Sequence, residues 1–138
     1  DNTSTDLVKA LDFALTLNAR SGAVLGATGG RVDHTLWNLS LLKRYRARLQ
    51  LTILDEWCET SLIDGEIEFT APVGQKLSLC PLTAASGITT SGLKFPLEVE
   101  SLAAGERDGI SNEVTESPVK ITVAEGDLLL CIQRDTGG

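Results

Sequence analysis

The stretch from residue 26 to residue 36 combines residue types that could bind phosphate groups. It reads Gly-Ala-Thr-Gly-Gly-Arg-Val-Asp-His-Thr-Leu and lies between a short apolar run and a strongly helical pattern. Gly29 and Gly30 lack a Cβ, so their N–H groups can approach an anion closely. Arg31 can donate two parallel hydrogen bonds to phosphate oxygens, and Asp33 can face a metal ion. The pattern therefore predicts a strand-to-helix turn of the kind that binds phosphates in α/β proteins.

The same residues also have a purely structural interpretation, which the chemistry alone leaves open. Asp33 would then cap the following helix, Arg31 would be a solvated surface charge, and the glycines would only form a tight turn. The spacing is neither the dinucleotide fingerprint nor the P-loop, because no Gly-Lys-Ser/Thr follows.

Three segments, in order along the chain, resemble motifs of the thiamine pyrophosphokinase family in its bacterial form. The first is Thr5-Asp6 with Lys9 one helical turn later. The second is Gly29-Gly30-Arg31-Val32-Asp33-His34, followed by Leu36 and Asn38-Leu39. The third, Gly109-Ile110-Ser111-Asn112, is similar to the Gly-x-Ser-Asn segment of the family's C-terminal thiamine-binding domain. The three matches extend across almost the whole chain.

The resemblance implies a transferase. Members of this family move the terminal diphosphate of ATP to the hydroxyl of thiamine, giving thiamine diphosphate and AMP. For this chain it therefore implies thiamine and ATP as substrates, Mg²⁺ as cofactor, and a cytoplasmic homodimer with thiamine between the subunits. Such chemistry needs charge spread over the transferred group and a hydroxyl held in line.

The resemblance also assigns roles to individual residues. The catalytic set is Asp6, Arg31 and Asp33, and the two aspartates are the expected metal ligands. The ATP- and phosphate-binding set is Lys9, Gly29, Gly30 and Arg31, and the thiamine-binding set is Asp33, Ser111 and Asn112. Two alternatives remain open: Asp33 could instead orient the thiamine hydroxyl, and His34 could be purely structural.

Composition excludes several classes of protein. The 138 residues carry 12 basic and 19 acidic side chains, a net charge of −7, which argues against a general nucleic-acid-binding surface. The sequence contains no apolar run long enough for a transmembrane helix. Its three cysteines are widely spaced and odd in number, which favours buried reduced thiols in a cytoplasmic protein over disulfides.

Hydrophobic periodicity predicts helix, strand, helix, strand over the first part of the chain. The expected elements are a helix from Thr5 to about Ala19, a strand at Ala23–Ala27, a helix from about His34 to Tyr45, and a strand at Leu49–Leu54. This order predicts the C-terminal half of a Rossmann-like, three-layer α/β nucleotide domain.

Several polar residues of this part have a simpler explanation beside the functional one. Asp6 suits the N-terminal end of a helix dipole. The cluster Lys43, Arg44, Arg46 and Arg48 suits a solvated helix C-terminus. Asp55-Glu56 is interpreted as a polar strand end, and Trp57 as a domain contact. Ser111 and Asn112 could equally bond a local loop backbone.

From about Glu59 the character changes to short β-rich runs separated by turns, which predicts a β-sandwich or barrel. We expect strands at Thr60–Ile63, Glu66–Thr70, Lys76–Cys80, Leu93–Val99, Val119–Val123 and Leu128–Gln133, and loops at 84–87, 103–105 and 125–127. The predicted domains are residues 1–60, a partial ATP-binding catalytic domain, and residues 61–138, a β-sandwich thiamine-binding domain.

One family feature has no match in the chain. The family's Asp-x-Asp-Ser motif is absent, and the sequence begins at Asp1 and contains no methionine. We therefore expect that an N-terminal segment carrying part of the sheet and further metal ligands precedes residue 1. The alternative is a truncated, non-catalytic module that binds thiamine and dimerises. A third hypothesis, another nucleotide-dependent transferase, would leave the match at residues 109–112 unexplained.

Overall fold

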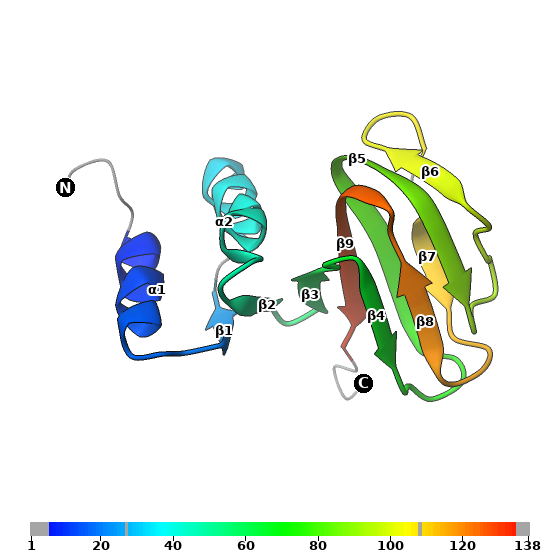
Figure 1. Ribbon diagram of the computed structural model, residues 1–138, viewed down its shortest axis with the longest axis horizontal. Helices are drawn as coiled ribbons and strands as arrows, with labels where there is room; N and C mark the ends of the chain where they lie inside the picture. Colours follow the sequence, from blue (N-terminus) through cyan, green and yellow to red (C-terminus); the bar gives the residue numbers. More distant parts are fainter. Residues whose placement is uncertain (1–5, 27, 108, 135–138) are drawn as a thin grey trace.

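The structure is a computed structural model that describes residues 6–26, 28–107 and 109–134. Its N-terminal part contains α1 (Asp6–Thr16), β1 (Ser21–Leu25), α2 (Val32–Tyr45) and β2 (Gln50–Leu54), beside a β-rich part (Figure 1). Strands β1 and β2 pair in parallel, with Leu25 opposite Leu54. The predicted order of helix, strand, helix and strand is confirmed. The predicted N-cap residue Thr5 lies outside the described residues.

Both helices pack on one face of the sheet. The side chains that form this core come from α1, α2, the turn before β2, β2 itself and β9, and they are Val8, Leu11, Leu41, Leu42, Tyr45, Leu49, Leu51, Ile53 and Leu129. The Tyr45 ring is fully buried, and its hydroxyl donates a hydrogen bond of 2.6 Å to Asp12. Of the α/β layers expected from the sequence, the described residues form a helical layer and the sheet. No described helix is long and apolar enough to span a membrane.

The β-rich part is built around the long strand β5. Its strands are β3 (Cys58–Leu62), β4 (Glu66–Phe69), β5 (Lys76–Ser91), β6 (Glu100–Ala103), β7 (Gly109–Glu113), β8 (Val119–Thr122) and β9 (Glu125–Gln133). The first half of β5 pairs with β9 and β7, and its last residues pair with β8, which in turn pairs with β4. A second hydrophobic core is formed by side chains of this part. The β-rich architecture predicted for these residues is confirmed.

The sheet is continuous across the position where the sequence predicts a domain boundary. Strand β3 covers residues 58–62, and it pairs with β2 on one side and with β9 on the other. Strand β9 is buried on both faces: Leu128 and Leu130 enter the core of the β-rich part, and Leu129 enters the helical core. The division at residues 60 and 61 stays a prediction.

The structure corrects several of the predicted strand limits. Residues 84–87 form part of β5, and residues 125–127 begin β9, although both were expected to be loops. The predicted strand ended at Cys80, but β5 continues through Pro81, which lies next to the register shift between Pro81 and Ala85. Strands β6 and β7 were not predicted from the sequence.

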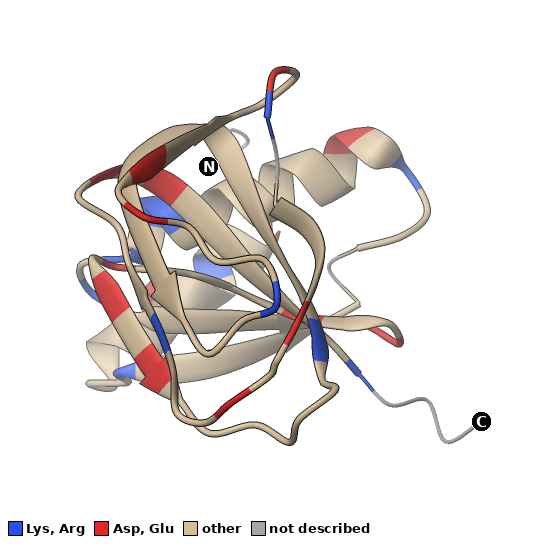
Figure 2. Ribbon diagram, turned by 90° about the vertical axis from the view of Figure 1, so that its right-hand side faces the viewer, with Lys and Arg blue, Asp and Glu red and all other residues tan. Residues whose placement is uncertain are grey.

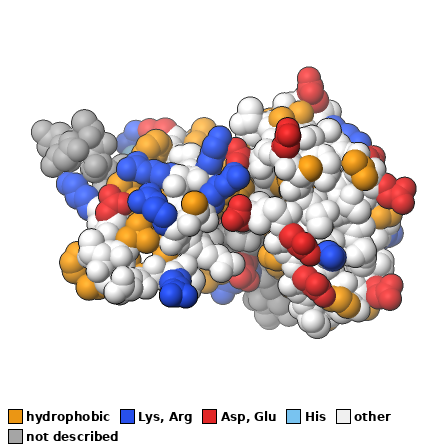
Figure 3. Space-filling view, viewed as in Figure 1, with side chains coloured by type: hydrophobic (Ala, Val, Ile, Leu, Met, Phe, Trp, Pro, Cys, Tyr) orange, Lys and Arg blue, Asp and Glu red, His pale blue; other side chains and the backbone are white. Residues whose placement is uncertain are grey.

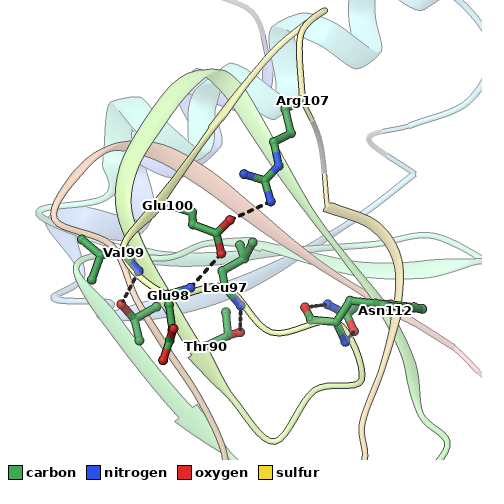
Figure 4. Close-up of polar contacts among 9 residues, drawn as sticks. Thr90, Leu97, Glu98, Val99, Glu100, Arg107 and Asn112 are labelled. Atoms are coloured by element: carbon green, nitrogen blue, oxygen red, sulfur yellow. Dashed lines mark hydrogen bonds and ion pairs between the residues drawn. The ribbon is translucent and has the colours of Figure 1, made fainter.

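The run Leu93–Val99 is not a strand, and side chains hold it in place instead (Figure 4). The Thr90 hydroxyl accepts the N–H of Leu97 at 2.9 Å, and the Thr89 hydroxyl accepts the N–H of Val99 at 3.1 Å. Glu100 accepts the N–H of Glu98 at 2.8 Å. Side chains thus accept the backbone N–H groups that a neighbouring strand would bind in a sheet. The apolar composition of the run was therefore a misleading sign of a strand.

Ion pairs join the end of α2 to the start of β9. The carboxylate of Asp127 is 2.6 Å from Arg46 and 2.8 Å from Lys43, and only 10% of its side chain is exposed. Figure 3 shows basic side chains gathered over the helical part and acidic ones over the β-rich part, and these ion pairs join the two parts. Lys43 and Arg46 are 59% and 39% exposed at the end of α2, as a solvated terminus implies, and they also have a specific partner in Asp127.

Candidate functional site

The glycine loop lies between β1 and α2, as predicted. Gly26, Gly29 and Gly30 have φ values of 69°, 84° and 65°, in the left-handed region that favours glycine. A Cβ added to any of them would meet nothing within 4 Å. The glycines are therefore required by the path of the backbone and not by crowding, and the loop leaves open space in which a ligand could approach its N–H groups.

Arg31 and Asp33 are paired with each other at the start of α2. Two nitrogen atoms of the Arg31 guanidinium donate to the two carboxylate oxygens of Asp33, at 3.1 and 2.5 Å. The N–H of His34 also donates to Asp33, at 2.9 Å. The guanidinium, and to a smaller extent the His34 contacts, hold the pKa of Asp33 below its usual value, against the opposing effect of desolvation. Both side chains are well exposed, so a ligand can reach either one.

Asp55 connects the glycine loop to the β-rich part. Its carboxylate accepts the Thr28 hydroxyl at 2.8 Å and the N–H groups of Trp57 and Cys58, each at 2.7 Å. Desolvation opposes the charge, but hydrogen bonds from Cys58, Thr28 and Trp57 outweigh it and lower the pKa of Asp55. An ionised carboxylate thus fixes the loop to the turn that precedes β3.

A cavity of about 410 Å³ lies beside this turn. Its walls come from the turn and from strands β3, β5, β7 and β9, and the lining residues are Trp57, Cys58, Lys76, Leu77, Ser78, Ser111, Cys131 and Gln133. The Trp57 side chain is 60% exposed, so its indole face is available to a ligand. The cavity offers an aromatic ring and hydroxyl groups, the features that hold a small heterocycle.

Ser111 and Asn112 project to opposite faces of β7. Ser111 has φ of 63°, its N–H donates to the Ser78 hydroxyl at 2.9 Å, and it lines the cavity. Asn112 is buried; its amide accepts the N–H of Phe95 at 3.0 Å and donates to the Phe95 carbonyl at 2.9 Å. Figure 4 shows these contacts of the Asn112 side chain as dashed lines. Ser111 is thus positioned for a ligand, and Asn112 for holding the segment that contains Phe95.

Asp6 and Lys9 lie on the first turns of α1, and both are exposed. Within the described residues, no three carboxylate, imidazole or thiol side chains gather into a potential metal site. Figure 2 shows acidic residues spread over the strands and loops of the β-rich end. The role of Asp6 and Asp33 as metal ligands therefore stays a prediction.

Sequence reasoning gave too little weight to Thr28, Asp55 and Trp57. The signal was present: parallel neighbours β1 and β2 end together at Leu25 and Leu54, so the loops after them must be adjacent. A larger cavity of about 590 Å³ lies elsewhere, lined by Arg20, Arg46, Arg48 and Asp64 among others. None of the site residues predicted from the sequence lines it, so the smaller cavity is the better candidate.

Comparison with known proteins agrees with the sequence motifs. The family model "Thiamin pyrophosphokinase, catalytic domain" matches residues 1–53, and "Thiamin pyrophosphokinase, vitamin B1 binding domain" matches residues 64–128. Thiamine pyrophosphokinase 1 of Oryza sativa subsp. japonica is 32% identical, with 96% of this chain and 54% of the relative covered. Thiamine pyrophosphokinase of Bacillus subtilis is 30% identical, with 95% of this chain and 63% of the relative covered.

Solved structures show the same relationship. The thiamin pyrophosphokinase of Geobacillus thermodenitrificans has a TM-score of 0.84 and 30% identity over 97% of this chain and 63% of its own. The thiamine pyrophosphokinase of Bacillus subtilis has a TM-score of 0.85 and 27% identity over 96% of this chain and 64% of its own. The chain spans 54% and 63% of the length of the two curated relatives named above. With both family domains matched in order and the fold shared, the chain belongs to the thiamin pyrophosphokinase family.

Proposed function

We propose that this protein transfers the diphosphate of ATP to the hydroxyl of thiamine and releases AMP. The observation that carries the proposal is the bond between Thr28 and Asp55, because it fixes a phosphate-type glycine loop next to the cavity that Ser111 lines. A diphosphate donor and a hydroxylated heterocycle would then be held by adjacent parts of one chain. Family membership supports the same reaction.

On the donor side, the glycine loop and the first turn of α2 would hold the phosphates of ATP. The open space around Gly29 and Gly30 permits close approach of their backbone, and the N-terminal end of a helix favours negative charge. Arg31 would exchange Asp33 for phosphate oxygens, since a guanidinium binds either anion with two parallel bonds. Lys9 and Asp6, on α1, are proposed to act on the same phosphates.

The expected metal is Mg²⁺, which neutralises charge on the transferred phosphates. Mg²⁺ commonly takes one or two protein carboxylates and completes its shell with water and substrate phosphates. The exposed Asp33 carboxylate fits such a shell once Arg31 has turned to ATP, and Asp6 is the second proposed ligand. Two protein carboxylates suffice for a metal that arrives together with ATP.

On the acceptor side, thiamine would occupy the cavity of about 410 Å³. Trp57 would cover a ring, Ser111 would bond it, and Asn112 would act through its hold on Phe95 as well as through the proposed thiamine contact. Asp33 is proposed to orient the attacking hydroxyl. We further propose that the protein is cytoplasmic and works as a homodimer.

The test is product formation by the protein expressed from its full gene. With Mg-ATP and thiamine, we expect AMP and thiamine diphosphate in equal amounts, measured by chromatography. Asp33→Ala should lower the rate strongly while Glu68→Ala, an exposed change on β4, should leave it unchanged. A folded protein that binds thiamine but forms neither product would contradict the enzyme and favour a thiamine-binding module.

A further inference from the structure

The three cysteines lie on one face of the sheet, on three neighbouring strands. Cys131 on β9 is opposite Thr60 of β3 and Ser78 of β5. Cys58 is two residues from Thr60, and Cys80 is two residues from Ser78, so each lies diagonally beside Cys131. None of the three forms a disulfide, and all are half-buried rather than buried as the sequence suggested.

Cys131 has the environment of a reactive thiol. Hydrogen bonds from Cys80 and from the Thr60 hydroxyl, the latter at 3.7 Å, favour its thiolate and lower the pKa of Cys131 to about 7 despite desolvation. Cys58 differs, because burial and the neighbouring charges of Cys131 and Asp55 raise its pKa. One thiol of the cluster is therefore activated and another on the same face is suppressed.

Cys131 is also accessible, because it lines the cavity of about 410 Å³ together with Trp57, Ser78 and Ser111. Cys80 is not among the residues that line the cavity, and the side chains of Cys80 and Cys131 both pack against the helical core. A small molecule that entered the cavity would thus meet the Cys131 sulfur, while the supporting hydrogen bonds approach from within the sheet.

We propose that Cys131 is a site of reversible covalent modification, at which small disulfides attach by thiol–disulfide exchange within the cavity. The Cys131 thiolate attacks one sulfur of the incoming disulfide, a new S–S bond forms, the old one breaks, and the second sulfur leaves as a thiolate. No further oxidant is needed, and excess free thiol reverses the step. The attached group would occupy the cavity beside Ser111.

The expected rate advantage follows from the thiolate fraction. At pH 7 about half of a thiol with a pKa of about 7 is ionised, against about 1% for a thiol at the usual 9.0. A lower pKa also reduces intrinsic nucleophilicity, with a Brønsted coefficient of about 0.45, or about eightfold here. The net expectation is that Cys131 reacts about sixfold faster at pH 7 than an ordinary thiol of equal exposure.

The experiment is stopped-flow reaction of the folded protein with dithiodipyridine across pH, using single Cys→Ser variants. We expect a fast phase of one thiol with a midpoint near pH 7 that persists in Cys58→Ser and is lost in Cys131→Ser. A further variant, Cys80→Ala, should keep the fast phase but move its midpoint to higher pH, because a donor to the Cys131 thiolate is removed. A merely structural Cys80 would leave the midpoint unchanged.

Two outcomes would overturn the proposal: a fast phase that remains in Cys131→Ser, or a Cys131 midpoint near that of an ordinary thiol. Peptide mapping of the mixed disulfide formed with oxidised glutathione should locate the label at Cys131. The site does not depend on the proposed enzyme activity, but its link to thiamine does. Thiamine bound in the cavity should slow the reaction of Cys131. If thiamine does not slow it while the fast phase is intact, the covalent site stands and the placement of thiamine in this cavity is wrong.

Discussion

The Thr28 hydroxyl donates a hydrogen bond of 2.8 Å to the Asp55 carboxylate, and this contact joins the glycine loop to the turn before β3. The two residues are 27 positions apart in sequence and become neighbours because β1 and β2 run in parallel. The loop that is proposed to hold ATP is therefore not positioned by its own glycines alone.

Removing this contact should weaken ATP binding more than thiamine binding. Thr28→Val deletes a hydrogen bond to a charged group and keeps the shape, so we expect a loss of about 1 kcal/mol, or about a fivefold higher KM for ATP. Steady-state kinetics with each substrate varied in turn measure the effect. Thr28→Ser keeps the hydroxyl and should behave like the unchanged protein. Equal increases in both KM values would contradict the assigned role.

Acid should release the same contact. The folded pKa of Asp55 lies below its usual 3.8, so the stability it contributes is fully present above pH 3.8 and is lost as pH falls through the folded pKa. Urea midpoints measured between about pH 5 and 2 should fall less steeply for Asp55→Asn than for the unchanged protein. The same slope in both proteins would show that Asp55 does not titrate as described.

The ion pair of Asp127 with Arg46 and Lys43 should stabilise the junction of α2 and β9. Arg46→Met leaves a nearly buried carboxylate with one partner, and we expect a loss of about 2 kcal/mol in the free energy of unfolding. Lys120→Met removes the exposed pair with Glu66 and should cost less than about 1 kcal/mol. Denaturant unfolding of both variants distinguishes them, and equal losses would mean that burial of Asp127 has no energetic consequence.

Gly126 and Gly105 form a matched pair that separates crowding from backbone strain. Both have positive φ, 99° and 78°, but a Cβ on Gly126 would lie 2.2 Å from the Ala84 carbonyl oxygen, whereas a Cβ on Gly105 would meet nothing within 4 Å. Gly105→Ala should cost about 1 kcal/mol for the conformation alone. Gly126→Ala should cost at least about 3 kcal/mol, because the clash adds to that strain. Thermal unfolding compares them, and similar losses would place the close approach of β9 and β5 in doubt.

The Asn112 amide should be more important for stability than for direct chemistry. Asn112→Asp keeps the acceptor for the Phe95 N–H but loses the donor to the Phe95 carbonyl, so we expect a loss of about 2 kcal/mol. Urea unfolding measures this loss, and thiamine KM reports the consequence for the cavity. An unaltered stability with a raised KM would instead support direct contact between Asn112 and thiamine.

Local patterns predicted the N-terminal elements well because α1, α2, β1 and β2 have strong periodicity and clear turn signals. They failed where long-range contacts decide the structure. The small residues 84–87 carry no strand signal, yet β9 and β6 pair with that part of β5. The apolar run Leu93–Val99 looks like a strand, yet Thr89, Thr90 and Asn112 hold its backbone with their side chains.

In the candidate site too, residues in local motifs were predictable and those that depend on the register of distant strands were not. The glycine loop and Ser111 could be identified from motifs, and Thr28, Asp55 and Trp57 could have been identified from the parallel pairing of β1 and β2. The relation between Cys131 and Cys80 could not, because it depends on the register of two strands separated by about 50 residues in the sequence.

The position of strand β9 determines when the nascent chain can complete its fold. It lies between β3 and β5 in the sheet, although it is the last described strand in the sequence. A ribosome therefore completes Glu125–Gln133 only after every other described strand has been made. Until then β3 and β5 have no common neighbour and both cores lack a wall. We expect the nascent chain to remain open, with apolar strand edges exposed, until residues 125–133 emerge.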